Sequence, residues 1–321
     1  MRAPRFWFSP PERPGWRARL LTPLGKLYAL GTAYRLSRSA PPTRLDIPVI
    51  CVGGLSVGGT GKTPTCIALA DLLRDRFHQP HIVTRGYGGS LAGPVRVDPA
   101  RHKADEVGDE ALLLAAFAEV WVAKDRAVGG RAAQAAGASV VILDDGFQNP
   151  SLAKDLSIIV VDAETGFGNE RCLPAGPLRE PASIGLSRAD LLLSIGSDYI
   201  PPRGSPPHIS GRLEPLQTGM QWQNLRVLAF AGIGRPEKFF ATLRSLGADL
   251  VRSEALGDHE KLSTPLLARL DREAARLDAQ LVTTEKDAAR LPPAYRSKVL
   301  TLPVRLQFTE NAALLSALDK V

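Results

Sequence analysis

Residues 50–64 constrain the fold of this chain more than any other segment. A short apolar run leads into a turn rich in glycine, and Gly61-Lys62-Thr63 follows at the start of a helical pattern. This order predicts a buried strand, a phosphate-binding loop and a helix whose N-terminus faces the phosphates. Lys62 is expected to reach the β- and γ-phosphates of ATP, and the Thr63 hydroxyl to ligate Mg²⁺. The residues assigned to nucleotide binding are Ser56, Val57, Gly58, Gly59, Thr60, Gly61, Lys62 and Thr63.

The loop departs from the usual spacing at one position. The pattern G-x-x-x-x-G-K-T requires glycine at position 56, where this chain has Ser56. A glycine turn with a purely structural lysine is the alternative. A nucleotide-dependent membrane switch of the deviant phosphate-loop type carries a signature lysine before the paired glycines, and this chain has Val57 there.

Short strands rich in Val and Ile alternate with helical patterns after residue 46. They are apolar almost without interruption, as strands covered by helices on both faces are. The pattern predicts an α/β fold of the P-loop NTPase-like class, with a doubly wound, mostly parallel sheet. The expected strands are residues 47–52, 81–84, 120–123, 140–144, 156–161 and 191–195, and the expected helices 62–77, 105–118 and 125–136.

A Pro/Gly-rich stretch at 201–207 interrupts the alternation, which restarts after a strand near 208–213. Further strands are expected at 226–230, 249–251 and 280–283, with helices at 236–246 and 264–278. We therefore expect a kinase core over residues 46–214 and a second, smaller α/β domain over 215–321.

The net charge of +7 is concentrated at the N-terminus. Nine basic and two acidic residues lie within residues 1–46, and the rest of the chain is balanced. Thr22 and Pro23 predict a helix start, and an apolar stripe recurs at helical spacing around it, at Leu20, Leu24, Leu27, Tyr28, Gly31 and Tyr34. A basic amphipathic helix over residues 1–45 favours docking to an anionic membrane surface. The alternative is a helix that packs its apolar stripe on the core; a nucleic-acid arm is disfavoured.

No apolar run is long enough to span a membrane, and no signal-peptide pattern is present. Cys51, Cys66 and Cys172 are odd in number and widely spaced, so we expect a reducing compartment and no cysteine-based metal site.

Several acidic residues are candidates for chemistry. An apolar run ends in Asp144 and Asp145, which predicts an Mg²⁺ partner at the carboxyl edge of the sheet. Asp109 lies near a helix start, where ordinary N-terminal charge bias is the alternative. His259 alone is more often structural than catalytic, and residues 283–287 have the pattern of a strand-to-helix cap.

Taken together, these residues resemble the tetraacyldisaccharide 4′-kinase family of lipid A biosynthesis. The resemblance covers almost the whole chain in order, at residues 56–64, 84–88, 108–110, 144–148, 173–181, 231–236, 258–259 and 283–287. It implies phosphorylation of the 4′-hydroxyl of a tetraacyldisaccharide 1-phosphate with ATP and Mg²⁺ at the cytoplasmic face of the inner membrane. No obligate protein partner is expected.

The resemblance also implies roles for single residues. Asp109 matches the acid that acts as general base, and His259 matches the histidine paired with it. Because the two are expected on different domains, catalysis is expected to need a closing step. The residues that match positions lining the substrate region are Arg85, Tyr87, Gln148, Arg179 and Glu180.

Three positions depart from the family pattern. Gly54 stands where asparagine is usual, Asn149 where histidine is common, and Ala111 where proline is typical. A kinase of a soluble metabolite, with a purely structural N-terminus, remains the alternative within the same chemistry.

Overall fold

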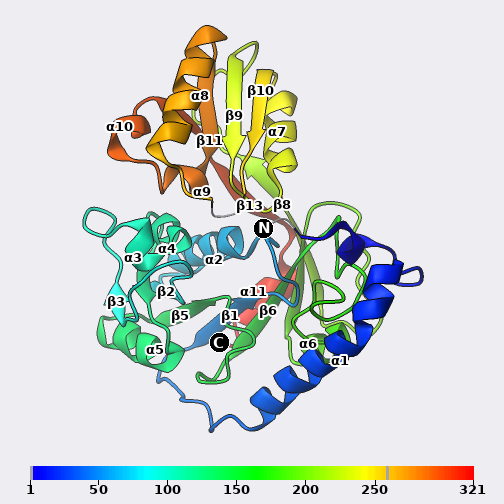
Figure 1. Cartoon of the computed structure of the whole chain (residues 1–321). Helices are drawn as coiled ribbons and strands as arrows, with labels where there is room; N and C mark the ends of the chain where they lie inside the picture. Colours follow the sequence, from blue (N-terminus) through cyan, green and yellow to red (C-terminus); the bar gives the residue numbers. More distant parts are fainter. Residues whose placement is uncertain (1–2, 258–259) are drawn as a thin grey trace. The chain divides into compact units, whose positions relative to one another are not determined.

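The computed structural model describes residues 3–257 and 260–321, which form two compact units. The larger unit comprises Ala3–Leu213 and Leu306–Val321, and the smaller one Glu214–Arg305. The last segment therefore differs from the boundary drawn from the sequence, because residues 306–321 pack with the larger unit. Figure 1 shows the elements of both units along the chain.

The larger unit is built on one nine-stranded sheet with the strand order β13-β8-β7-β6-β1-β5-β2-β4-β3. The pairings of β1, β2 and β4 to β8 are parallel, and β3 pairs antiparallel with β4 at the edge. The strands are β1 Val49–Gly53, β2 Pro80–Thr84, β3 Val95–Arg96, β4 Glu119–Val122, β5 Val140–Asp144, β6 Leu156–Asp162, β7 Leu191–Ile195, β8 His208–Pro215 and β13 Val304–Glu310.

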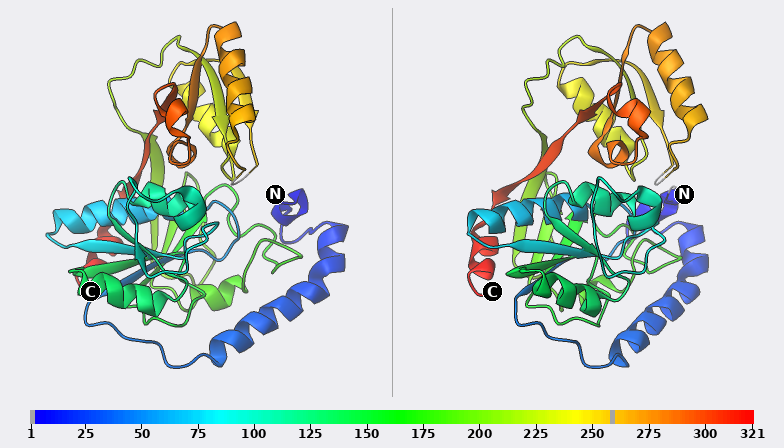
Figure 2. Two further views of the ribbon diagram at one scale, coloured as in Figure 1. Left: turned by 60° about the vertical axis from the view of Figure 1, so that its left-hand side comes forward. Right: turned by 90° about the vertical axis from the view of Figure 1, so that its left-hand side faces the viewer.

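Helices cover both faces of this sheet, so β1, β2, β5, β6 and β7 are buried along their whole length. α2 and α4 lie on one face and α5 on the other, as Figures 1 and 2 show. The helices of this unit are η1 Arg5–Phe8, α1 Trp16–Ser37, α2 Lys62–Asp75, α3 Ala104–Val107, α4 Asp109–Leu114, α5 Arg126–Ala135, α6 Ala182–Leu186 and α11 Ala312–Leu318. The doubly wound, mostly parallel sheet predicted from the sequence is confirmed.

The smaller unit has a four-stranded parallel sheet with the order β10-β9-β11-β12. Its strands are β9 Arg226–Ala231, β10 Asp249–Ala255, β11 Gln280–Thr284 and β12 Val299–Leu302. Its helices are α7 Pro236–Ser245, α8 Thr264–Arg276, α9 Glu285–Ala288 and α10 Pro293–Arg296. Apolar clusters on its two faces form a core of its own, as the sequence predicted.

The N-terminal helix α1 is present but does not begin where the sequence indicated. It starts at Trp16, so Pro23 lies inside it, and the Thr22 hydroxyl donates to the Ala18 carbonyl instead of capping the helix. Similarly, the single helix expected at 105–118 is two short helices, because Gly108 adopts a positive φ of 89° between them.

The residues that helix α1 buries fully against the larger unit are all small. Ala18, Gly25 and Thr32 are buried, whereas the leucines and tyrosines of the expected stripe are exposed. The alternative in which this stripe packs on the core is therefore wrong. None of the described helices is both long and apolar enough to cross a membrane.

The close approach of α1 to the segment at 172–175 yields a matched pair of variants. A Cβ at Gly25 would lie 2.8 Å from the Cys172 carbonyl oxygen, whereas a Cβ at Gly31 would meet nothing within 4 Å. Gly31→Ala should stabilise the protein by about 0.5–1 kcal/mol through helix propensity. Gly25→Ala should give no such gain or a loss, because the backbones must move apart. Urea unfolding of both variants measures the difference; equal gains would contradict this packing.

Candidate active site

The phosphate loop connects the central strand β1 to helix α2. Because β1 lies between β5 and β6, its carboxyl end opens at the middle of the sheet edge, where ligands of such sheets bind. Gly61 caps α2 with a φ of 95°, and Lys62 is the first residue of the helix. Lys62 and Thr63 thus stand at the helix N-terminus, as the sequence predicted.

Two side-chain hydroxyl groups of the phosphate loop are buried without a hydrogen-bond partner among the described residues. They are Ser56 Oγ and Thr60 Oγ1. A buried hydroxyl without a partner is costly in a folded protein, and phosphate oxygens would satisfy both groups. This observation fits the assignment of the loop to a triphosphate.

A second segment, at 172–180, pairs with the phosphate loop. The Val57 N–H donates to the Pro177 carbonyl at 2.9 Å, and the Arg179 N–H donates to the Leu55 carbonyl at 2.7 Å. Ser56 and Leu178 form an antiparallel bridge between these two contacts. The sequence predicted only that Arg179 and Glu180 line the substrate region; it did not predict that their segment supports the loop.

Asp145 follows β5 with a left-handed backbone, at φ 52°, and its carboxylate lies beside two positively charged side chains. Arg179 donates to both of its carboxylate oxygens at 3.0 Å, and Lys62 Nζ lies 3.8 Å from Oδ1. Burial acts to raise the pKa of Asp145, but the charges of Lys62 and Arg179 outweigh it, so this pKa is lowered. Asp145 is therefore an ionised residue that connects the loop lysine to the segment at 172–180.

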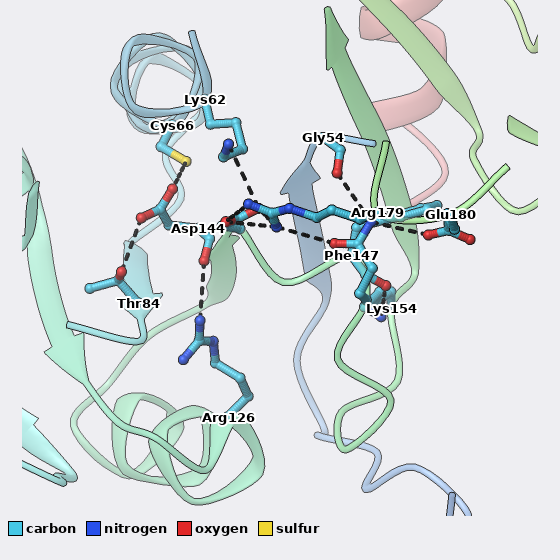
Figure 3. Close-up of polar contacts among 12 residues, drawn as sticks. Gly54, Lys62, Cys66, Thr84, Arg126, Asp144, Phe147, Lys154, Arg179 and Glu180 are labelled. Carbon is cyan, nitrogen blue, oxygen red and sulfur yellow. Dashed lines mark hydrogen bonds and ion pairs between the residues drawn. The ribbon is translucent and has the colours of Figure 1, made fainter. Parts of the chain in front are cut away.

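Asp144, the last residue of β5, has the opposite electrostatic character. Thr84 Oγ1 donates to Oδ2 at 3.0 Å, and the Cys66 thiol lies 3.8 Å from Oδ1 (Figure 3). Burial, and then the charges of Glu110 and Asp145, raise the pKa of Asp144 to about 7. A carboxyl group whose pKa is raised by burial and by neighbouring acids is a favourable place for a divalent metal ion.

The donor set fits Mg²⁺ better than a metal held by protein ligands alone. Within residues 3–257 and 260–321, no three His, Cys, Asp or Glu side chains are grouped to hold a metal ion. Mg²⁺ usually takes one or two carboxylates together with substrate phosphates and water. Asp144 and the Thr63 hydroxyl would supply hard oxygen ligands here, with Asp145 beside them.

Gln148 and Glu180 belong to the same buried network. Gln148 Nε2 donates to the Gly54 carbonyl at 3.1 Å and to Glu180 Oε1 at 3.0 Å. Glu180 is buried and also pairs with Arg188, whose guanidinium lies 4.6 Å from the Phe147 ring centroid. These two residues brace the base of the loop, and their predicted contact with substrate remains a prediction.

Asp109, Arg85 and Tyr87 lie at a neighbouring part of this edge. Asp109 is buried at the first position of α4, and Arg85 and Tyr87 are exposed on the turn after β2. A Cβ at Gly108 would lie 2.6 Å from the Tyr87 carbonyl oxygen, so this turn rests against the start of α4. The structure thus places the turn that carries Arg85 and Tyr87 against the start of α4, where Asp109 lies. His259 lies outside the described residues.

Arg126 is a residue of this site that the sequence reasoning missed. It is buried at the start of α5 and donates to the carbonyls of Ala123 at 2.8 Å and Asp144 at 3.4 Å. Burial lowers its pKa, while the charges of Asp144 and Asp145 oppose that shift. A cation in the first turn of a helix is unfavourable to the helix dipole, and this was the signal available in the sequence.

Comparison with known proteins decides the family. The family model described as tetraacyldisaccharide-1-P 4'-kinase matches residues 17–321. The chain belongs to this family.

Curated relatives and a solved structure agree. Tetraacyldisaccharide 4'-kinases of Dinoroseobacter shibae and a Jannaschia species are 58% and 57% identical, over 99% and 100% of this chain and 97% and 99% of theirs. The fold is similar to a crystal structure of LpxK from Aquifex aeolicus in complex with ATP, with a TM-score of 0.78 and 28% identity. That match covers 94% of this chain and 98% of the other.

The raised pKa of Asp144 predicts a pH-dependent stability. Because the carboxyl is harder to ionise folded than unfolded, it contributes stability fully below its unfolded pKa of about 3.8. That contribution is lost as pH rises through its folded pKa of about 7. In metal-free protein, Asp144→Asn should therefore raise the melting temperature clearly at pH 8 and little at pH 5. Calorimetry at both values measures this, and an equal change at the two would contradict the assigned ionisation.

Proposed function

We propose that this chain transfers the γ-phosphoryl group of ATP to the 4′-hydroxyl of a tetraacyldisaccharide 1-phosphate. The observation that carries the proposal is the meeting of Lys62, Asp144 and Asp145 at the carboxyl edge of the sheet, in a chain of this family. Phosphoryl transfer relies on positioning and on stabilising charge, and this edge offers both.

Each proposed residue has a role in the transfer of the phosphoryl group. The 4′-hydroxyl loses its proton to the Asp109 carboxylate, with His259 assisting, while its oxygen forms a bond to the γ-phosphorus. The bond from that phosphorus to the oxygen of the β-phosphate breaks, and ADP leaves with the electron pair. Lys62 and the loop N–H groups stabilise the negative charge of the transferred group. Bound Mg²⁺ would neutralise charge on the β- and γ-phosphates.

Substitution of Lys62 and Asp109 tests these roles. Lys62→Ala should abolish turnover, because it removes the cation that contacts the transferred group. Asp109→Ala should lower kcat by about 10²- to 10⁴-fold and leave the KM for ATP nearly unchanged, as loss of a general base does. Steady-state transfer of labelled γ-phosphate to detergent-solubilised acceptor measures both. Near-normal turnover of Lys62→Ala would remove the assignment of the loop, and a pure KM effect would make Asp109 a binding residue.

We further propose that α1 docks the enzyme on an anionic membrane surface, at the cytoplasmic face of the inner membrane. Leu20, Leu24, Leu27 and Leu30 are each at least half exposed, and basic residues lie among them. Arg17 and Arg38 stack on the rings of Trp16 and Tyr34. Exposed apolar side chains beside cations suit the boundary between headgroups and acyl chains. A kinase of a soluble metabolite would have no use for this surface.

Removing the leucines of α1 tests the docking. Exchange of Leu20, Leu24 and Leu27 for glutamate should lower binding to vesicles of mixed anionic lipid by at least about tenfold, since the full burial of even one leucine contributes roughly 1.5–3 kcal/mol and 1.4 kcal/mol is a factor of about ten. The matched control exchanges Phe77 and Ile200 for glutamate as well. Both residues are exposed on the larger unit outside α1, so this variant should bind vesicles as the unchanged protein does. Cosedimentation with vesicles measures both. Equal binding of the two variants would contradict docking through α1.

A further inference from the structure

Three segments of the smaller unit lie at the same edge of its sheet. Because β9, β10 and β11 are parallel, the segments that follow them share the carboxyl edge. The described residues of these segments include 231–236, Gly257 with Glu260, and 284–287. The last was expected to be only a strand-to-helix cap. The Thr284 side chain does accept the Asp287 N–H at 3.2 Å, which confirms the cap, but Asp287 makes further contacts.

The Asp287 carboxylate is completely buried and connects two of these segments. It accepts the Gly232 N–H at 2.9 Å and the Thr284 hydroxyl at 2.8 Å, and it pairs with Arg290. The Gly232 contact lies beyond the end of β9, 55 residues away in the chain. Asp287 thus fixes the turn after β9 against the turn after β11.

Arg290 extends this connection to the segment after β10. Its Nη1 donates to the Glu260 carbonyl at 2.8 Å, and its Nη2 donates to Asp287 and to the Gly232 carbonyl at 3.4 Å. A Cβ at Gly232 would lie 2.5 Å from Nη2 and 3.2 Å from the Gly257 carbonyl oxygen, so only glycine leaves room. The planar guanidinium fork suits several fixed acceptors at once, as a lysine would not.

Gly257 and Glu260 are in turn tied to each other. The Gly257 N–H donates to Glu260 Oε2 at 2.6 Å, and the Glu260 N–H donates to the Gly257 carbonyl at 2.9 Å. The ion pair of Asp287 and Arg290 therefore holds the backbone of the residue that follows His259 in the chain. A buried ion pair is weak evidence for a contribution to stability, so its geometric effect is the more informative one.

We propose that Asp287 and Arg290 are positioning residues for the reaction, which act through Glu260 on the segment that carries His259. This inference rests on the proposed function, in which His259 assists Asp109. It assigns a task to Asp287, the last residue of the motif at 283–287, beyond its part in the cap of α9.

Arg290→Gln and Asp287→Asn test the proposal, with Arg252→Gln as the matched control. Arg252 lies on β10 of the same unit and forms ion pairs with Glu254 and Glu273. We expect Arg290→Gln to lower kcat about tenfold or more with the KM for ATP within about twofold, as loss of a supporting partner does. Hydrogen exchange of a peptide covering residues 253–262 should become faster in Arg290→Gln and stay unchanged in Arg252→Gln.

A double variant separates positioning from a general loss of structure. If Arg290 acts through His259, then Arg290→Gln combined with His259→Ala should be no slower than His259→Ala alone. Additive losses, or unchanged kcat and exchange in Arg290→Gln, would overturn the inference. If Arg290→Gln does not fold, the same comparison with Arg290→Lys applies. Normal activity of His259→Ala would instead contradict the proposed role of His259, which distinguishes that failure from this one.

Discussion

Asp145 holds the site together through one short set of contacts. Its carboxylate accepts hydrogen bonds from both terminal nitrogens of Arg179 and lies near the ammonium group of Lys62. Asp145 directly follows β5, a strand that is buried along its whole length. Loss of this anion would leave the Arg179 guanidinium without its carboxylate partner and would remove the side-chain link from Lys62 to the segment at 172–180, while the backbone pairing of this segment with the phosphate loop would remain. The loop is consequently braced by a second segment, and does not depend on its glycines alone.

The two adjacent aspartates differ in the direction in which their surroundings shift the pKa of the carboxyl group. Lys62 and Arg179 keep Asp145 ionised, whereas Asp144 has the Thr84 hydroxyl, a thiol and other acids as neighbours. Asp144 is therefore the carboxylate with the greater need for a divalent cation, whereas Asp145 is already paired with Lys62 and Arg179. Arg126, which donates to the backbone of Asp144, fixes the end of the strand without neutralising the Asp144 carboxylate.

Much of this arrangement could be predicted from the sequence, because local pattern determined it. β5 and β7 begin and end at the predicted residues, since each is a short run of mostly apolar residues that follows a polar one. The loop at 56–63 and the acids at the end of β5 follow from the same alternation.

Long-range contacts could not be predicted in this way. The pairing of Val57 with Pro177, the return of 306–321 to the larger unit and the link from Arg290 to Glu260 join residues far apart in the chain. The burial of α1 through Ala18, Gly25 and Thr32 was also missed, because the stripe of large apolar residues masked the small ones.

The central claim is that phosphate is transferred to the 4′-hydroxyl of a tetraacylated disaccharide. The most direct test supplies purified protein with γ-labelled ATP, Mg²⁺ and either the tetraacyl disaccharide 1-phosphate or its 4′-deoxy analogue. The account predicts label in the first lipid, at the 4′ position, and none in the second. Equal labelling of both lipids, or no labelling of either while ATP still binds, would contradict it.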